Sequence, residues 1–393
     1  MLAQMTNTPR DYEWGSTTLL AGLEGRTPTG RPEAEVWFGD HPGSPAIMAD
    51  GRTLGAWLAD EGTGTGAPAR LPYLLKLLAA ASPLSIQAHP SRAEAAAGFA
   101  REEAAGVPRD AAERTYRDEN HKPELIVAIS DTFTALAGLR EIDATRRLVT
   151  ALGPAGAGLA ARLAGPDAAA ALRATIAWLL SGDAQADVDA IVAAAADAHR
   201  DEFSAELDLV GRLAALHAGD PGIVVALLMN LVTLQRGEGV FVPAGVLHAY
   251  LEGLGVELMA ASDNVLRGGL TPKHIDVAEL LRVLDSTPGP APVVRPDVIG
   301  GGVSRYATAA PDFALTRVVV GSADSATVPI TGVAIAVATA GSVEVEGESG
   351  ARVMLTPGLA VIVTPDEAKL RLSGEGEVFI AQPGTTSPAV SAS

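Results

Sequence analysis

Three side chains that could hold a metal or a polar substrate stand at alternate positions of one short segment. They are Ser85, Gln87 and His89, within the stretch 83–90. Alternate residues of a β-strand point to the same face, so a strand here would direct all three at one spot. Glutamine and histidine can ligate a metal, and serine can hold a phosphate or a sugar hydroxyl. The pattern predicts a polar site rather than pure core packing.

A second segment, 120–124, places a lysine two residues before a carboxylate. These residues are Lys122 and Glu124, and His121 lies beside them. If the segment is extended, Lys122 and Glu124 share a face. A cation and a carboxylate would then stand side by side.

A third segment carries a turn followed by a histidine. Gly237, Pro243, Gly245 and His248 fit the pattern G-x5-P-x-G-x2-H. Pro243 and Gly245 favour a turn between two strands, so His248 would begin the next strand and Tyr250 would share its face. The pattern resembles the second motif of the cupin superfamily, small β-barrels that hold a metal at the barrel mouth.

The match to generic cupins is incomplete. That motif often continues with an asparagine four residues after the histidine, where this chain has Glu252. The first cupin motif usually holds His-x-His and a nearby carboxylate, whereas this chain has Gln87-Ala88-His89 and the more distant Glu124.

This variant pattern resembles the type I phosphomannose isomerases, and the matching motifs occur in the same order along the chain. The motifs are Glu13–Gly15, Ala34–Pro42, Ser85–Pro90, His121–Glu124, Pro243–Tyr250 and Glu257–Lys273. The resemblance implies one Zn²⁺ per chain, held by Gln87, His89, Glu124 and His248. Two imidazoles, a carboxylate and an amide oxygen suit zinc with one position left open, although other divalent metals could use the same ligands.

The remaining histidines are interpreted as structural or surface residues. They are His41, His199, His217 and His274.

The last segment of the resemblance adds Arg267 and Lys273 around a Gly-Gly turn.

Four cations could form a positive site in an acidic protein. They are Lys76, Lys122, Arg267 and Lys273. Arginine and lysine pair strongly with phosphate oxygens, so a sugar phosphate is the ligand that such a cluster favours. The alternative, cations that only solvate a surface, stays open for Lys76 in particular.

The resemblance implies interconversion of mannose 6-phosphate and fructose 6-phosphate through ring opening and an enediol(ate). Zinc would polarise the vicinal oxygens, and Arg267 would add fixed positive charge. Histidine has the ordinary pKa nearest neutrality, which favours His121 as the proton carrier, with Lys122 as the second candidate. Tyr250, Glu257 and a zinc-bound water remain alternatives.

The other expected substrate contacts come from several segments. Glu257 and Asp263 are interpreted as orienting residues. The remaining expected contacts are Trp14, Glu35, Ser85, Tyr250, Lys273 and Lys76.

Two other functions fit the cupin motifs less well. A cupin oxygenase usually uses three histidines, and this chain has Gln87 in place of one. A non-catalytic sugar-binding cupin would lose ligands or basic residues that are all present here. A metal assay separates the first alternative from an isomerase, and turnover separates the second.

Composition limits the possible classes of protein. The chain has 393 residues, 48% hydrophobic residues, no cysteine and a net charge of −18. These values indicate about two or three folded domains and exclude thiolate sites and disulfides. The negative charge argues against nucleic acid and anionic membranes as partners. Without a signal peptide or an apolar run of about 18 residues, we expect a cytoplasmic protein, most simply a monomer.

The hydrophobic pattern predicts a mainly β fold with a helical insertion. Buried strands are expected at 71–81 and 125–129, and a helix at 91–105 with a Ser91/Glu94 capping box. The predicted units are a cupin (double-stranded β-helix) catalytic barrel at 1–140 and 222–286, an all-helical insertion at 141–221, a linker at 287–292, a second cupin-like β domain at 293–384 and a disordered tail at 385–393.

Overall fold

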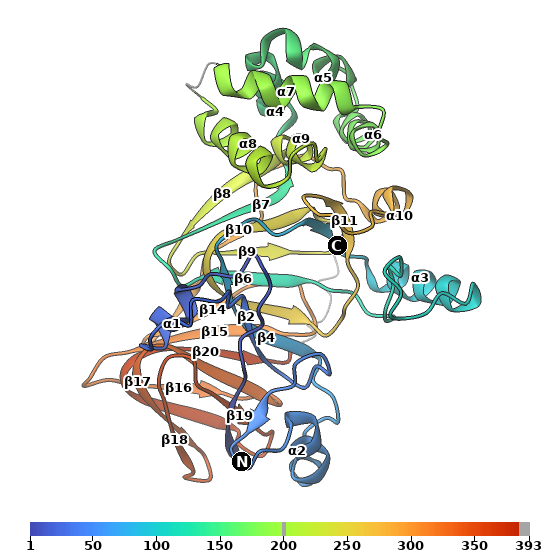
Figure 1. Ribbon diagram of the computed structural model, residues 1–393. Coiled ribbons are helices and arrows are strands. Elements are labelled where there is room, and N and C mark those ends of the chain that lie inside the picture. The colour runs from blue at the N-terminus through green and yellow to red at the C-terminus, as the bar shows by residue number, and fades with distance from the viewer. Residues whose placement is uncertain (199–201, 385–393) are drawn as a thin grey trace, which may run out of the picture.

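The computed structural model describes residues 1–198 and 202–384. In these ranges the strands form two antiparallel sheets of ten strands each. Figure 1 shows the first sheet in the middle of the molecule, a group of helices at one end of it, and the second sheet at the other end. The predicted fold class, mainly β with a helical insertion, is confirmed.

The first sheet forms the barrel that carries most of the predicted site residues. Its longest strand, β10 (His248–Ala260), pairs with β5 and β7 through its first half and with β4 and β6 through its second half. This strand therefore contributes to both faces of the barrel. The other strands are β2 (Glu35–Phe38), β4 (Tyr73–Ala80), β5 (Ile86–Ala88), β6 (Glu124–Ala128), β7 (Thr132–Leu139), β8 (Met229–Gln235), β9 (Gly239–Val242), β11 (Leu266–Gly269) and β12 (Val293–Val294). Strands β4 and β6 confirm the two buried strands expected at 71–81 and 125–129.

Helices fill the region predicted as an insertion at 141–221 and continue to residue 227. Asp167 caps α6 (Ala168–Leu180) by accepting a hydrogen bond from the Ala170 N–H, and a segment that contains Gly182 follows this helix. The helices are α4 (Ile142–Ala151), the 3₁₀ turn η2 (Gly153–Gly156), α5 (Ala157–Arg162), α6 (Ala168–Leu180), α7 (Gln185–Asp197), α8 (Ser204–Leu216) and α9 (Gly222–Leu227). Their apolar faces share one core with Ile86 of β5 and Leu251 of β10, so the insertion packs directly on the barrel.

The second sheet contains the β-rich runs predicted after residue 293. Its strands are β1 (Leu2–Thr6), β3 (Ile47–Met48), β13 (Asp297–Gly300), β14 (Val303–Tyr306), β15 (Ala314–Val320), β16 (Ser325–Pro329), β17 (Ala334–Gly347), β18 (Arg352–Leu355), β19 (Ala360–Val363) and β20 (Lys369–Gln382). The β-rich stretches 334–338 and 343–345, which Gly341 and Ser342 separate in the sequence, are parts of the single strand β17. A bulge and Gly341, with φ +69°, allow the strand to continue between them.

Sheet membership departs from the predicted domain limits at both ends of the second unit. β1 and β3, from the N-terminal segment, belong to the second sheet, where β1 pairs with β19. β12 pairs with β9 of the first sheet. The limits of the domains therefore stay predictions, and the tail predicted at 385–393 lies outside the described residues.

Four further helices and one 3₁₀ turn lie between the strands. They are α1 (Leu19–Leu23), α2 (Leu54–Asp60), η1 (Gly62–Thr65), α3 (Arg92–Ala104) and α10 (Val277–Val283). Helix α3 has the predicted capping box, in which the Ser91 side chain accepts from the Glu94 N–H and the Glu94 carboxylate accepts from the Ser91 N–H. None of the helices within 1–198 and 202–384 is long and apolar enough to cross a membrane.

The two sheets bury a common hydrophobic core. Phe38 and Leu75 of the first sheet pack in one cluster with Ile335 and Phe379 of the second sheet. The second sheet therefore supports the barrel from the side opposite to the helical insertion (Figure 1).

Candidate active site

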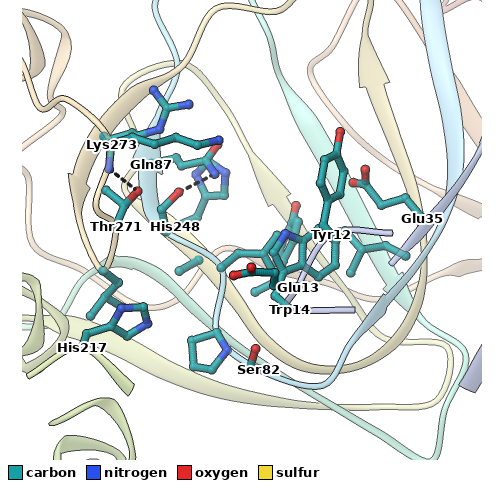
Figure 2. A pocket seen from close by; sticks show the side chains of 18 of the residues that line it. Tyr12, Glu13, Trp14, Glu35, Ser82, Gln87, His217, His248, Thr271 and Lys273 are labelled. Atoms are coloured by element: carbon teal, nitrogen blue, oxygen red, sulfur yellow. Dashed lines mark hydrogen bonds between the residues drawn. The ribbon is translucent and has the colours of Figure 1, made fainter. Parts of the chain in front are cut away.

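A cavity of about 530 Å³ lies where the barrel meets the end of the helical insertion. In Figure 2, Gln87, His248, Thr271 and Lys273 lie on one side of it, and Tyr12, Glu13, Trp14 and Glu35 lie on the other. Twelve of the residues predicted from the sequence line it: Trp14, Glu35, Lys76, Ser85, Gln87, Lys122, Glu124, His248, Tyr250, Glu257, Arg267 and Lys273.

Two histidines and a carboxylate converge at the inner end of this cavity. His89 Nε2 lies 3.0 Å from one oxygen of Glu124, and His248 Nε2 lies 3.3 Å from the other. One ligand atom from each of the three residues falls within 4.8 Å of the others, and all three side chains are buried. This spacing suits a single metal ion.

The hydrogen bonds of both imidazoles leave Nε2 available as a ligand. His89 Nδ1 lies 2.8 Å from the carbonyl oxygen of Asn264, and His248 Nδ1 lies 3.2 Å from that of Val246. Because a carbonyl oxygen can only accept, Nδ1 carries the proton on each ring. His89 Nε2 is fully buried and makes no hydrogen bond, which would be costly unless another group such as a metal satisfied it. Burial, followed by the charge of Lys122, lowers the pKa of His89 to about 4 and keeps the ring neutral.

Gln87 is placed beside the group by the register of two strand pairs. It lies opposite His248 of β10 and opposite Arg267 of β11. Its amide nitrogen donates to Ser85 Oγ at 3.0 Å. The amide carbonyl oxygen is therefore the atom of Gln87 that could serve as a metal ligand.

Glu124 is also bound by a lysine and a tyrosine. Lys122 Nζ lies 2.9 Å from one Glu124 oxygen, and the Tyr250 hydroxyl donates to the other at 3.1 Å. Burial alone would raise the pKa of Glu124, but the charge of Lys122, the largest opposing effect, helps to hold that pKa well below its usual value. The carboxylate is thus ionised and able to bind a cation.

A second buried network extends from the same cavity. Lys76 Nζ lies 2.8 Å from Glu257 and 3.3 Å from Glu35, and Trp37 Nε1 donates to Glu35 at 2.9 Å. Burial raises the pKa of Glu257, and the nearby carboxylates of Glu124 and Glu35 raise it further against the opposing effect of Lys76. Lys76 is only 6% exposed, so it belongs to the cavity wall rather than to a solvated surface.

Arg267 and Lys273 give another part of the cavity a positive charge. Within the described residues neither forms an ion pair, in contrast to Lys76 and Lys122. Burial, and then the charge of nearby Arg117, lowers the pKa of Arg267. Burial, Arg267 and Arg117 lower that of Lys273. Such a group of cations suits an anionic ligand.

Three predicted residues do not line the cavity: His89, which is buried against Glu124 in the metal group, and His121 and Asp263. His121 precedes Lys122 and points away from it: its Nε2 lies 2.6 Å from Asp312 of the second β unit. The alternation that turns Lys122 and Glu124 inward turns His121 outward. Asp263 accepts hydrogen bonds from His41 at 3.1 Å, and its neighbour Asn264 is the residue that supports His89.

Other residues of the cavity were missed by sequence reasoning. Tyr12 and Glu13 adjoin the predicted Trp14, and their motif was a signal that could have included them. His217, interpreted above as a structural or surface residue, is partly exposed and also lines the cavity. It lies at the end of α8, where the insertion meets the barrel, and no local pattern marks that contact. His199, given the same interpretation, lies outside the described residues.

Comparisons with known proteins agree with this geometry. Residues 2–142 match the family model described as phosphomannose isomerase type I, catalytic domain. The mannose-6-phosphate isomerase of Salmonella typhimurium is 34% identical over 96% of this chain and 98% of its own length. The Escherichia coli mannose-6-phosphate isomerase is 39% identical over 71% of this chain and 74% of its own. A zinc-bound crystal structure of mannose 6-phosphate isomerase superposes with a TM-score of 0.88 and 33% identity, covering 98% of this chain and 99% of that one.

A small antiparallel barrel with two histidines and a carboxylate at its inner cavity defines a metal-binding cupin. Within that class, the chain belongs to the type I phosphomannose isomerase family. The prediction that it is an isomerase of this family is confirmed.

Proposed function

We propose that this protein interconverts mannose 6-phosphate and fructose 6-phosphate with one zinc ion bound by Gln87, His89, Glu124 and His248. The observation that carries the proposal is a single cavity that joins three elements. These are the buried His–Glu–His group, a lysine in contact with it, and two cations that form no ion pair in the part of the chain that the structure describes. The Salmonella typhimurium relative, aligned over 96% of this chain, and the Escherichia coli relative, aligned over 71%, carry this activity in their names.

The arrangement suggests how the substrate lies in the cavity. The phosphate would pair with Lys273, which forms no ion pair within the described residues. The reacting carbons would then lie toward Glu124 and Lys122. Glu257 and Glu35, held by Lys76, would accept hydrogen bonds from sugar hydroxyls, and Trp14 would cover the sugar ring.

The reaction moves one proton from C2 to C1 and another from the C2 oxygen to the C1 oxygen after the ring has opened. Lys122 is the group we propose for the carbon-bound proton, because it lies in the cavity next to the metal group while His121 faces Asp312. Zinc, when bound, would supply Lewis-acid polarisation of the two substrate oxygens. Arg267 would add fixed positive charge near those oxygens as the enediolate develops.

Turnover of the zinc-loaded protein tests this proposal. Formation of fructose 6-phosphate should stop on chelation and return with zinc. Lys122→Met should lower kcat by about 10²-fold or more, the usual contribution of a general base, without loss of zinc. Lys369→Met is the matched control, because Lys369 is exposed and forms its ion pair with Glu348 on the surface. A zinc-loaded wild-type protein that forms no product would refute the isomerase, and normal turnover by Lys122→Met would refute the assignment of the base.

A further inference from the structure

The turn after β11 holds the one non-glycine residue with a positive φ in the described chain. Leu270 has φ +57° and is buried. A leucine rarely adopts this left-handed conformation, and it persists only where surrounding contacts fix it. Leu270, Thr271, Pro272 and Lys273 all line the cavity, so this turn (the 270–273 turn) places Lys273.

The contacts that fix the turn come from the helical insertion. Asp220, just before α9, accepts a hydrogen bond from the Thr271 N–H at 3.0 Å through one carboxylate oxygen. Its other oxygen accepts from the Gly222 N–H at 2.7 Å. One side chain therefore joins the start of α9 to the 270–273 turn.

Two glycines bring the two backbones into direct contact at the same place. A Cβ on Gly222 would lie 2.6 Å from the Leu270 nitrogen and 2.7 Å from the Gly269 Cα. A Cβ on Gly269, whose φ is +129°, would lie 2.4 Å from the Gly222 Cα. Neither position has room for a side chain unless the backbone moves. Thr271 continues the turn by accepting the Lys273 N–H at 3.2 Å.

Arg267 is held differently from Lys273. Arg267 lies within β11 and is paired with Gln87 of β5, so the strand ladder fixes its backbone. Lys273 lies beyond the ladder and depends on the 270–273 turn. Contacts made by the insertion therefore affect the position of Lys273 more than the position of Arg267.

We infer that Asp220 is a positioning residue: it acts through the 270–273 turn to hold Lys273 where the substrate phosphate binds. The inference rests on the proposed function for the identity of the substrate. It assigns the helical insertion a part in substrate affinity, in addition to forming a wall of the cavity.

The test is a double-mutant cycle of Asp220→Ala and Lys273→Met. Asp220→Ala should raise KM for mannose 6-phosphate about tenfold, while kcat and zinc content stay near wild type. This rise is smaller than the loss of about 100-fold that a misplacement of about 1 Å can cause. Asp220→Asn keeps one acceptor oxygen, so its KM should lie between that of wild type and that of Asp220→Ala. In the Lys273→Met background Asp220→Ala should raise KM little further, because its effect passes through Lys273. An unchanged KM in Asp220→Ala, or additive effects in the cycle, would overturn the inference.

A second pair of variants does not depend on the carboxylate. Gly222→Ala places an alanine in α9, which favours the helix, but drives a methyl group into the 270–273 turn. Gly211→Ala is the control, because Gly211 lies in α8 with nothing within 4 Å of the added Cβ. We expect a raised KM for Gly222→Ala only. If both variants keep a wild-type KM, the turn does not set phosphate affinity and the inference fails.

Calorimetric titration with inorganic phosphate separates this inference from the proposed function. Wild-type protein should bind phosphate more tightly than Asp220→Ala, whether or not it turns over mannose 6-phosphate. If the wild-type protein is active but binds phosphate no more tightly than Asp220→Ala does, the positioning role of Asp220 is overturned and the proposed function stands. Phosphate binding that depends on Asp220 in an inactive wild-type protein would support the positioning role and refute the isomerase.

Discussion

His89 shows how neighbouring atoms prepare one side chain for a metal. A backbone carbonyl holds its Nδ1 proton, burial keeps the ring neutral, and its Nε2 remains without a hydrogen bond beside Glu124. A neutral imidazole with a fixed tautomer is the form that binds zinc. Burying this nitrogen without a hydrogen bond is unfavourable, and a metal ion bound to the same atom would offset that cost.

The first prediction concerns this ligand. His89→Asn should weaken zinc binding by more than about 100-fold, since even groups that only support a ligand often account for 10- to 100-fold. His274→Asn, which changes an exposed histidine, should leave zinc affinity unchanged. Competition with a chromophoric chelator measures both. Equal zinc affinity in the two variants would remove His89 from the ligand set.

At the scale of elements, β10 connects the metal group with the second buried network. His248 and Tyr250 lie before its bend, and Glu257 lies after it. The pairing register shifts between Tyr250 and Glu252, and Gly253 follows with φ +130°. A Cβ on Gly253 would lie 2.7 Å from the Phe133 ring and 3.0 Å from backbone atoms of β7. This glycine therefore lets one strand serve both faces of the barrel.

The second prediction follows from that bend. Gly253→Ala should destabilise the protein by roughly 2–4 kcal/mol, through an unfavourable φ together with steric overlap in the core. Gly66→Ala shares the positive φ but meets nothing within 4 Å. We expect that control to lose only about 1 kcal/mol. Urea denaturation of the two variants compares them, and similar losses would show that close packing at Gly253 is unimportant.

At the scale of the whole molecule, a buried carboxylate joins the two β units. Glu377 of β20 accepts hydrogen bonds from Thr339 at 2.6 Å and from Arg317 at 2.7 Å within the second sheet. It also accepts one at 2.6 Å from Arg236, which lies between β8 and β9 of the first sheet. Burial alone would raise the pKa of Glu377, but the hydroxyl donor and the two guanidinium groups outweigh it and lower that pKa.

The third prediction uses this junction. Glu377→Gln should destabilise the protein by roughly 2–3 kcal/mol at pH 7, less than the 3–5 kcal/mol typical of a fully buried pair, because both arginines are partly solvated. A carboxylate whose pKa is lowered by folding contributes its full stabilisation above the pKa that it has in the unfolded chain, near 4.5. This stabilisation is lost progressively as the pH falls from that value toward the lower pKa of the folded state. The difference between wild type and variant should therefore narrow as the pH falls toward 4.

Urea midpoints at pH 7, 5 and 4 provide the measurement. Glu252→Gln is the control, since Glu252 and its partner Arg212 are both more than half exposed. We expect that variant to change stability by less than about 0.5 kcal/mol at each pH. A Glu377→Gln difference that stays constant down to pH 4 would show that the charge of Glu377 does not stabilise the junction.

Local patterns in the sequence were enough to predict several features of this protein. Alternation of side chains by two placed Gln87 beside Ser85 on one face and paired Lys122 with Glu124, because both relations lie within a single extended segment. The capping box of α3 and the buried runs of β4 and β6 were equally local. The family resemblance then collected the three ligand segments into one site, which no local pattern could have done.

Only the tertiary structure decided which distant groups meet. It buried Lys76 between Glu35 and Glu257, turned His121 toward Asp312, brought His217 to the cavity and linked Asp220 to the turn that carries Lys273. It also placed the N-terminal strand β1 in the second sheet. These contacts join residues from about 40 to more than 350 positions apart in the sequence. Periodicity fixes which face of its own strand or helix a side chain occupies, whereas packing of the assembled elements selects the partner across that face.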